Sequence, residues 1–190
     1  YMQPPRALFE DDPFWTAHPD AAGNVSEPIT LDKGGKRAMT SLCTSTPPVK
    51  AYLREAFATL AEALPDLGGV ILITASEYPS HCWGRGGAMP DASGNTKTKR
   101  INCERCLQRD PVDVVAELIQ LIRDGIRDVS PSIDVIAWNW SWFAFDPIPN
   151  PRIIAKLPRD VILMAGFERG GKKELLGRKD YLIDEYSLSY

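Results

Sequence analysis

The sequence has 190 residues and a net charge of −3, so it is long enough to form one domain with a sizeable hydrophobic core. Lysines and arginines are scattered apart from the short run at 97–100, which excludes a broad basic surface for nucleic acid. No apolar run reaches the roughly 18 to 20 residues of a membrane span, and the N-terminus lacks the pattern of a signal peptide. We therefore expect a domain that binds neither nucleic acid nor membranes.

The first part of the chain predicts a long loop, then a helix and then a strand. Residues 1–46 are rich in Pro, Gly, Asp and Thr without sustained periodicity, so only a short helix near Asp12–His18 is expected there. An amphipathic helix follows, with Ser45 or Thr46 as its N-cap and two prolines at its first positions. A run of apolar residues from Gly69 onward then predicts a buried strand.

The second part of the chain alternates between strands and helices. A cysteine-containing loop at 79–110 precedes a helix that Asp110 caps. Strands are then expected near 133–140, 160–166 and 181–186, with a short helical piece near 151–157. Nearly continuous apolar strands that alternate with helices predict a parallel sheet in an α/β fold. Both chain ends are strand-like, so we expect the sequence to be a segment of a larger domain.

Carboxylates directly follow several predicted strands, where parallel sheets carry their active sites. Glu77 follows the first strand and Glu185 ends the last, and two carboxylates across one pocket are the minimum machinery for cleaving a glycosidic bond. We expect Glu77 to be the general acid, and a solvated carboxylate or a helix cap is its alternative role. Asp184 and Glu185 point in opposite directions along a strand, so only one can face the pocket. Glu168 precedes a basic run, so a surface ion pair is expected.

Aromatic and polar side chains complete the predicted sugar site. Trp138, Trp140 and Trp142 alternate along one strand and its extension, so all three should face the same side and stack on sugar rings. Burial in the core is the alternative, above all for Trp138. His81 is expected to contact substrate hydroxyls, and its alternatives are metal binding or a hydrogen bond to a loop carbonyl. Arg6 is expected to clamp substrate hydroxyls or a carboxylate.

The cysteines form a second group of candidate functional residues. The two-residue gap between Cys103 and Cys106 lets both thiolates grip one tetrahedral metal ion, and Cys82 lies in the same loop. Cys82 or His81 is the candidate for the third ligand position, and Cys43 or another group is the candidate for the fourth. We expect a structural zinc ion, with a disulfide that involves Cys82 or free thiols as alternatives. A thioredoxin-like redox site is disfavoured, because the two cysteines do not lie at a strand-to-helix turn.

Six motifs occur in the order Tyr1-Met2-Gln3-Pro4-Pro5-Arg6, Leu42-Cys43-Thr44-Ser45, Ile73-Thr74-Ala75-Ser76-Glu77, Cys103-Glu104-Arg105-Cys106, Ala137-Trp138-Asn139-Trp140-Ser141-Trp142 and Ile183-Asp184-Glu185-Tyr186. This succession resembles the middle of TIM-barrel glycoside hydrolase-like proteins, which are relatives of β-N-acetylhexosaminidases and α-glucuronidases from bacteria that degrade polysaccharides. The resemblance implies a (β/α) TIM-barrel-type fold for residues 1–190, as a partial barrel of about strands three to seven. It also implies an oligosaccharide or glycoside substrate and no cofactor for catalysis.

The resemblance also implies roles for the two glutamates. Glu77 would follow the fourth barrel strand as acid/base, and Glu185 would follow the seventh as nucleophile. In hexosaminidases an aspartate precedes the acid and assists the substrate acetamido group, whereas Ser76 stands there in this sequence. A non-catalytic carbohydrate-binding barrel and a zinc-dependent hydrolase are the competing hypotheses.

Overall fold

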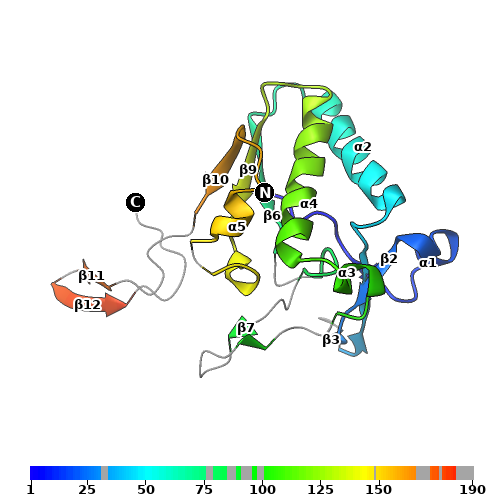
Figure 1. The fold of residues 1–190 in the computed structure, drawn as a ribbon, viewed down its shortest axis with the longest axis horizontal. Helices are drawn as coiled ribbons and strands as arrows, with labels where there is room; N and C mark the ends of the chain where they lie inside the picture. The colour runs from blue at the N-terminus through cyan, green and yellow to red at the C-terminus, as the bar shows by residue number, and fades with distance from the viewer. Residues whose placement is uncertain are drawn as a thin grey trace.

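The computed structural model describes residues 1–30, 34–75, 79–84, 89–90, 96–97, 101–147, 149–165, 172–175 and 177–182. At its centre lies a parallel sheet of three strands in the order β10-β9-β6 (Figure 1). These strands are β6 (Gly69–Ile73), β9 (Asp134–Trp138) and β10 (Val161–Met164). Their register aligns Ile73, Trp138 and Met164 in one row, so all three strands end at the same edge of the sheet.

The N-terminal segment extends this sheet beyond β6. The Met2 N–H donates to the Ile71 carbonyl and the Ile73 N–H donates to the Met2 carbonyl, both at 2.8 Å. This parallel bridge places the beginning of the chain beside β6, on the side away from β9.

Helices cover one face of the sheet through a continuous apolar core. The helices are α2 (Pro47–Ala63), α4 (Pro111–Arg127) and α5 (Pro151–Ile154). Val70 and Leu72 of β6 and Val135 and Ala137 of β9 alternate along their strands, and all four share one core cluster with these helices. The helices α2 and α4 pack side by side (Figure 1), and they lie in close contact at Gly125, where a Cβ would be 2.3 Å from the Arg54 carbonyl oxygen.

Residues 1–46 contain more structure than the predicted loop. An antiparallel sheet is formed by β1 (Leu8–Phe9), β5 (Met39–Leu42) and β2 (Ala22–Val25), in that order. The predicted short helix is present as α1 (Phe14–Ala17), and η1 (Pro19–Ala21) follows it. The remaining small elements are β3 (Ile29–Thr30) paired with β4 (Lys36–Arg37), β7 (Met89–Pro90) paired with β8 (Thr96–Lys97), α3 (Glu104–Leu107) and η2 (Trp142–Ala144).

The predicted (β/α) TIM-barrel-type fold, as a partial barrel of about strands three to seven, is wrong. The described residues form one parallel three-stranded sheet together with several antiparallel sheets, which is not a barrel pattern. Of the strand expected near 181–186, residues 181 and 182 are described, and they end β12 (Arg178–Leu182), which pairs in an antiparallel hairpin with β11 (Lys172–Leu175). A parallel strand would need a crossover of a dozen or more residues, whereas a tight turn with Gly177 at φ 79° connects these two strands.

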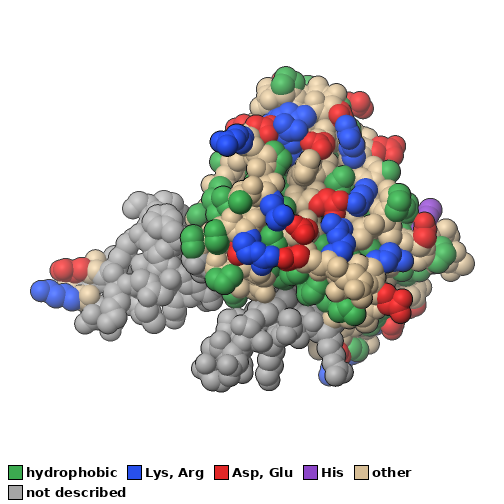
Figure 2. Space-filling view, in the orientation of Figure 1, with side chains coloured by type: hydrophobic (Ala, Val, Ile, Leu, Met, Phe, Trp, Pro, Cys, Tyr) green, Lys and Arg blue, Asp and Glu red, His purple; other side chains and the backbone are tan. Residues whose placement is uncertain are grey.

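The surface over α2 and α4 carries interspersed charges of both signs (Figure 2). Its basic side chains are paired with carboxylates, as in Arg54 with Asp128 and Arg123 with Asp160. No helix in the described ranges has the length and apolar character to cross a membrane.

Candidate metal site

All four cysteines of the sequence converge at one buried point. The sulfur atoms of Cys43, Cys82, Cys103 and Cys106 lie within 4.8 Å of one another, and the Cys43 Sγ is 3.7 Å from those of both Cys103 and Cys106. The four thiols are free, because a disulfide requires sulfur atoms about 2.05 Å apart. Four thiolates on one tetrahedral zinc ion, at about 2.3 Å each, have sulfurs about 3.8 Å apart. The two distances from the Cys43 sulfur match this spacing, and the whole cluster is compact enough to hold one metal ion.

Cys43 is held at the junction of β5 and α2. Its N–H donates to the carbonyl of Ala21 at 2.8 Å. Because Ala21 directly precedes β2, this hydrogen bond continues the pairing between β5 and β2 by one residue. The Thr46 hydroxyl donates to the Cys43 carbonyl at 2.9 Å, directly before α2 begins. Backbone hydrogen bonds on both sides thus fix the direction of the Cys43 side chain.

Cys82 is held by the loop that follows β6. The neighbouring His81 is fully buried, and its Nδ1 accepts the N–H of Trp83 at 3.3 Å. Nδ1 as acceptor leaves Nε2 as donor, and Nε2 donates to the Thr74 carbonyl at 2.6 Å. His81 therefore fastens this loop to the end of β6, and the sulfur of Cys82 takes the place beside the other cysteines.

Cys103 and Cys106 are presented by the single turn of α3. The N–H of Cys106 donates to the Cys103 carbonyl at 3.1 Å, which brings both side chains to the same side. The turn is anchored by reciprocal hydrogen bonds just before it: the Asn102 N–H donates to Asn24 Oδ1 and the Val25 N–H donates to Asn102 Oδ1, both at 2.8 Å. The antiparallel sheet thus positions the two-cysteine turn.

Gly23 of β2 packs directly against the cluster. A Cβ at this position would lie 2.5 Å from the Cys82 Sγ and 2.9 Å from the Ser41 carbonyl oxygen. The pairing of β2 with β5 is irregular here, between the pairs Ala22–Leu42 and Val25–Thr40. Only a residue without a side chain lets the strand approach the sulfur this closely.

The four thiols share protons among themselves when no metal is bound. Hydrogen bonds from Cys106 and Cys82 lower the pKa of Cys43 far below its ordinary value. The hydrogen bond with Cys82 lowers the pKa of Cys103 to about 6. The pKa values of the other two cysteines change in the opposite direction. The hydrogen bond with Cys103 raises the pKa of Cys82, and the hydrogen bond with Cys43 raises the pKa of Cys106 to about 12. A metal ion would displace the remaining protons from Cys82 and Cys106.

The residues predicted for the sugar site lie in separate environments. The strand β9 ends at Trp138, and Ser141 adopts a left-handed φ of 58°, so the alternation does not continue to Trp142. Trp142 is fully buried, and its indole N–H donates to Thr74 Oγ1 at 3.0 Å. Trp138 and Trp140 are half-buried and meet edge to face, with ring centroids 4.7 Å apart. The predicted catalytic residues Glu77 and Glu185, and also Glu168, lie outside the described residues.

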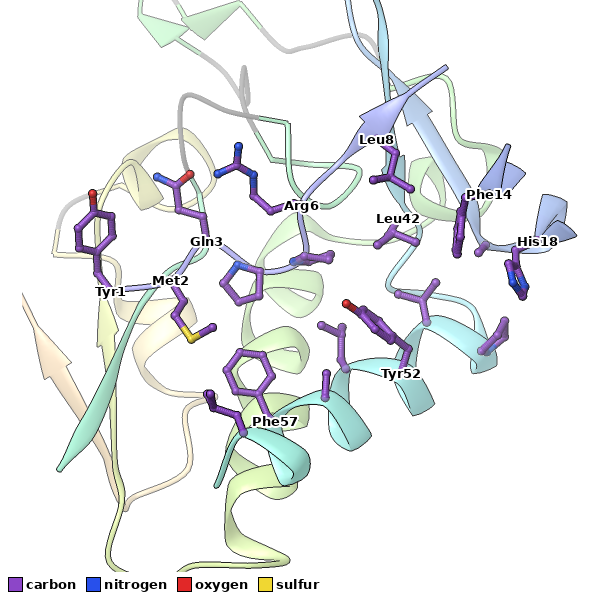
Figure 3. Close-up of a pocket in the computed structure, with 18 residues that line it drawn as sticks. Tyr1, Met2, Gln3, Arg6, Leu8, Phe14, His18, Leu42, Tyr52 and Phe57 are labelled. Atoms are coloured by element: carbon purple, nitrogen blue, oxygen red, sulfur yellow. The ribbon is translucent and has the colours of Figure 1, made fainter. Parts of the chain in front are cut away.

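A cavity of about 850 Å³ lies between the N-terminal segment and α2 (Figure 3). Its described lining is largely apolar and includes Met2, Tyr52 and Phe57. Arg6 belongs to this lining, whereas His81, the predicted tryptophans and the cysteines do not. The predicted sugar-site residues therefore do not share this cavity.

Comparison of the sequence with protein-family models gave no match, and a search of curated proteins found no relative. The metal site thus rests on the geometry of this chain. The spacing of Cys103 and Cys106 pointed to this site, and so did the proximity of Cys82 in sequence. Cys82 rather than His81 takes the third position of the cluster, and Cys43 takes the fourth.

Proposed function

We propose that Cys43, Cys82, Cys103 and Cys106 together hold one structural zinc ion. The observation that carries this proposal is the convergence of four buried sulfurs within 4.8 Å of one another. Soft thiolate ligands favour zinc among the common divalent metals, and four of them leave no position for a water molecule. The closed ligand set supports a structural role and argues against a zinc-dependent hydrolase.

The zinc ion would join three segments that are distant in sequence. Cys43 follows β5, Cys82 lies in the loop after β6, and the turn of α3 carries the other two ligands. The metal would therefore connect the antiparallel sheet to the central parallel sheet. Since such a site is not formed in an unfolded chain, the free energy of metal binding becomes free energy of folding.

Metal removal tests this proposal. We expect the purified protein to contain one zinc ion per chain, and a chelator to lower the melting temperature reversibly. A ligand present at 100 times its Kd stabilises a fold by about 2.7 kcal/mol, so the shift should be several degrees. Substitution by cobalt should give the absorption bands of tetrahedral thiolate coordination, and Cys43→Ser should weaken them. The structural role would be refuted if the purified protein contained no zinc and if its melting temperature were the same with and without the chelator.

We further propose that the domain cleaves glycosidic bonds, with Glu77 as acid/base and Glu185 as the second carboxylate. Support comes from the common edge at which β6, β9 and β10 end, because Trp140 follows β9 at that edge and Glu77 follows β6 in the sequence. The half-buried side chain of Trp140 keeps part of its surface accessible for stacking on a sugar. A non-catalytic carbohydrate-binding domain would use the same aromatic surface.

Replacement of Glu77 separates these two functions. We expect Glu77→Gln to lower turnover of a responsive aryl glycoside by at least ~10²-fold without changing the melting temperature, because general acid catalysis contributes 10² to 10⁴. Glu62→Gln, on the exposed face of α2, is the matched control. Equal turnover in the Glu77 variant would exclude this residue as the acid. Sugar binding without turnover in the unmodified protein would favour the binding domain.

A further inference from the structure

The charge of the proposed zinc site requires compensation. A zinc ion bound by four thiolates carries a net charge of −2, and the four cysteines here are buried. Burial of an unpaired charge is costly, so cations or hydrogen-bond donors are expected beside the sulfurs. We therefore looked for such groups next to each cysteine.

Ser45 and Arg109 form a chain of hydrogen bonds that ends on Cys106. The Ser45 Oγ lies 3.3 Å from the Cys106 Sγ, and Arg109 Nη1 donates to the same Ser45 oxygen at 2.8 Å. A guanidinium can only donate and a metal-bound thiolate can only accept, so in the zinc-bound site the Ser45 oxygen accepts from Arg109 and the Ser45 hydroxyl donates to the Cys106 sulfur. Arg109 thus acts on Cys106 through the Ser45 hydroxyl.

The position of Arg109 is fixed by an ion-pair network between α2 and α4. Glu117 of α4 accepts from Arg109 Nη2 at 2.7 Å and also pairs with Lys50 of α2. These three side chains are about one third exposed or less, so solvent screens them only in part. The network holds the guanidinium in the orientation that Ser45 requires.

Arg105 brings a second cation close to the cysteine cluster. It lies between Cys103 and Cys106 in sequence, and its guanidinium donates to the carbonyl of Ala22, the first residue of β2. The next residue of this strand, Gly23, is the one that packs against the Cys82 sulfur. Arg105 thus places its positive charge on the strand that contacts the cluster.

We propose that the Ser45–Arg109 pair and Arg105 are positioning residues that stabilise the zinc-bound thiolates, the pair through its hydrogen bond to Cys106 and Arg105 through its charge beside β2. The inference rests on the proposed zinc site. It adds that the affinity of the site is set by residues that do not touch the metal.

Zinc affinity and the cobalt spectrum of matched variants test this proposal. Zinc affinity is measured at pH 7 by competition with a chromophoric chelator for Arg105→Gln, Arg109→Gln and Ser45→Ala. We expect each variant to bind zinc about 10- to 100-fold more weakly, as loss of groups that support metal ligands typically does. The cobalt d–d bands should persist, because four thiolates remain, while the sulfur-to-cobalt charge-transfer band moves to longer wavelength. Arg105→Lys should recover part of the affinity.

Arg54→Gln is the control, because Arg54 pairs with Asp128 on the exposed side of the same two helices. Ser45→Ala removes only the hydroxyl and keeps the ion-pair network. Its zinc affinity therefore measures the effect of the hydrogen bond on the Cys106 thiolate even if Arg109→Gln unfolds. Affinities within twofold of the unmodified protein in all three variants, with an unshifted charge-transfer band, would overturn the proposal. If the unmodified protein shows no tetrahedral cobalt spectrum, the zinc site itself fails and this inference fails with it.

Discussion

Replacement of Gly23 by alanine is the sharpest test of the cysteine cluster. The added methyl group would lie 2.5 Å from the Cys82 Sγ and 3.2 Å from the Cys43 Cα. Carbon and sulfur atoms in contact are normally more than about 3.5 Å apart, so the sulfur must move by about 1 Å or the strand β2 must shift. Gly23 has no left-handed φ, so any effect comes from these contacts and from the 2.9 Å approach to the Ser41 carbonyl oxygen, with Cys82 the closest, and not from backbone strain.

The size of this effect follows from the tolerance of metal coordination. Zinc–sulfur distances vary by only about 0.2 Å around 2.3 Å, so a displacement of about 1 Å at Cys82 disrupts one ligand. Overpacking of a filled interior typically costs 1–3 kcal/mol. If this cost falls on the zinc-bound state, it corresponds to a zinc affinity that is roughly 5- to 150-fold lower.

Zinc competition and thermal unfolding measure this effect, with Gly68→Ala as the matched control. A Cβ at Gly68 meets no atom within 4 Å, so the control should bind zinc normally and be as stable as the unmodified protein or slightly more so. Gly23→Ala should bind zinc weakly and melt at a lower temperature when zinc is present. Equal zinc affinity in the two glycine variants would refute the assignment of Cys82 as a ligand in this geometry.

Two further predictions concern helix packing and pH. Gly125→Ala should destabilise the protein by about 1–3 kcal/mol in denaturant unfolding, despite the higher helix propensity of alanine, because its methyl group meets the Arg54 backbone. A free energy of unfolding equal to that of the unmodified protein would show that α2 and α4 can move apart to admit the methyl group without an energetic cost. Zinc affinity should rise with pH above neutrality, because hydrogen bonding and burial raise the pKa of Cys82 and Cys106, whose protons must leave before the metal binds. A zinc affinity that does not change between pH 6 and 8 would contradict the release of these protons before metal binding.

Helix and strand positions followed from local signals in the sequence. Pro47 and Pro111 open α2 and α4 as predicted, and Asp110 caps α4 by accepting the Val112 N–H at 2.9 Å. Residues close in sequence determine such features, so the sequence alone reveals them. The prediction of a partial barrel was wrong because the apolar pattern of a strand does not reveal which other strand it pairs with. In the structure β12 pairs antiparallel with β11 through a turn at Gly177.

The candidate functional residues show the same difference between local and long-range features. The spacing of Cys103 and Cys106 identified two metal ligands, since a two-residue gap places both on one turn wherever that turn lies. The predicted alternation of the tryptophans failed to extend to Trp142, because Ser141 leaves the extended conformation. The sequence by itself determined which residue types can hold a metal and where helices begin. Only the tertiary structure joined Cys43 to Cys106 across 63 positions, because packing of β5, α2 and α3 decides that contact.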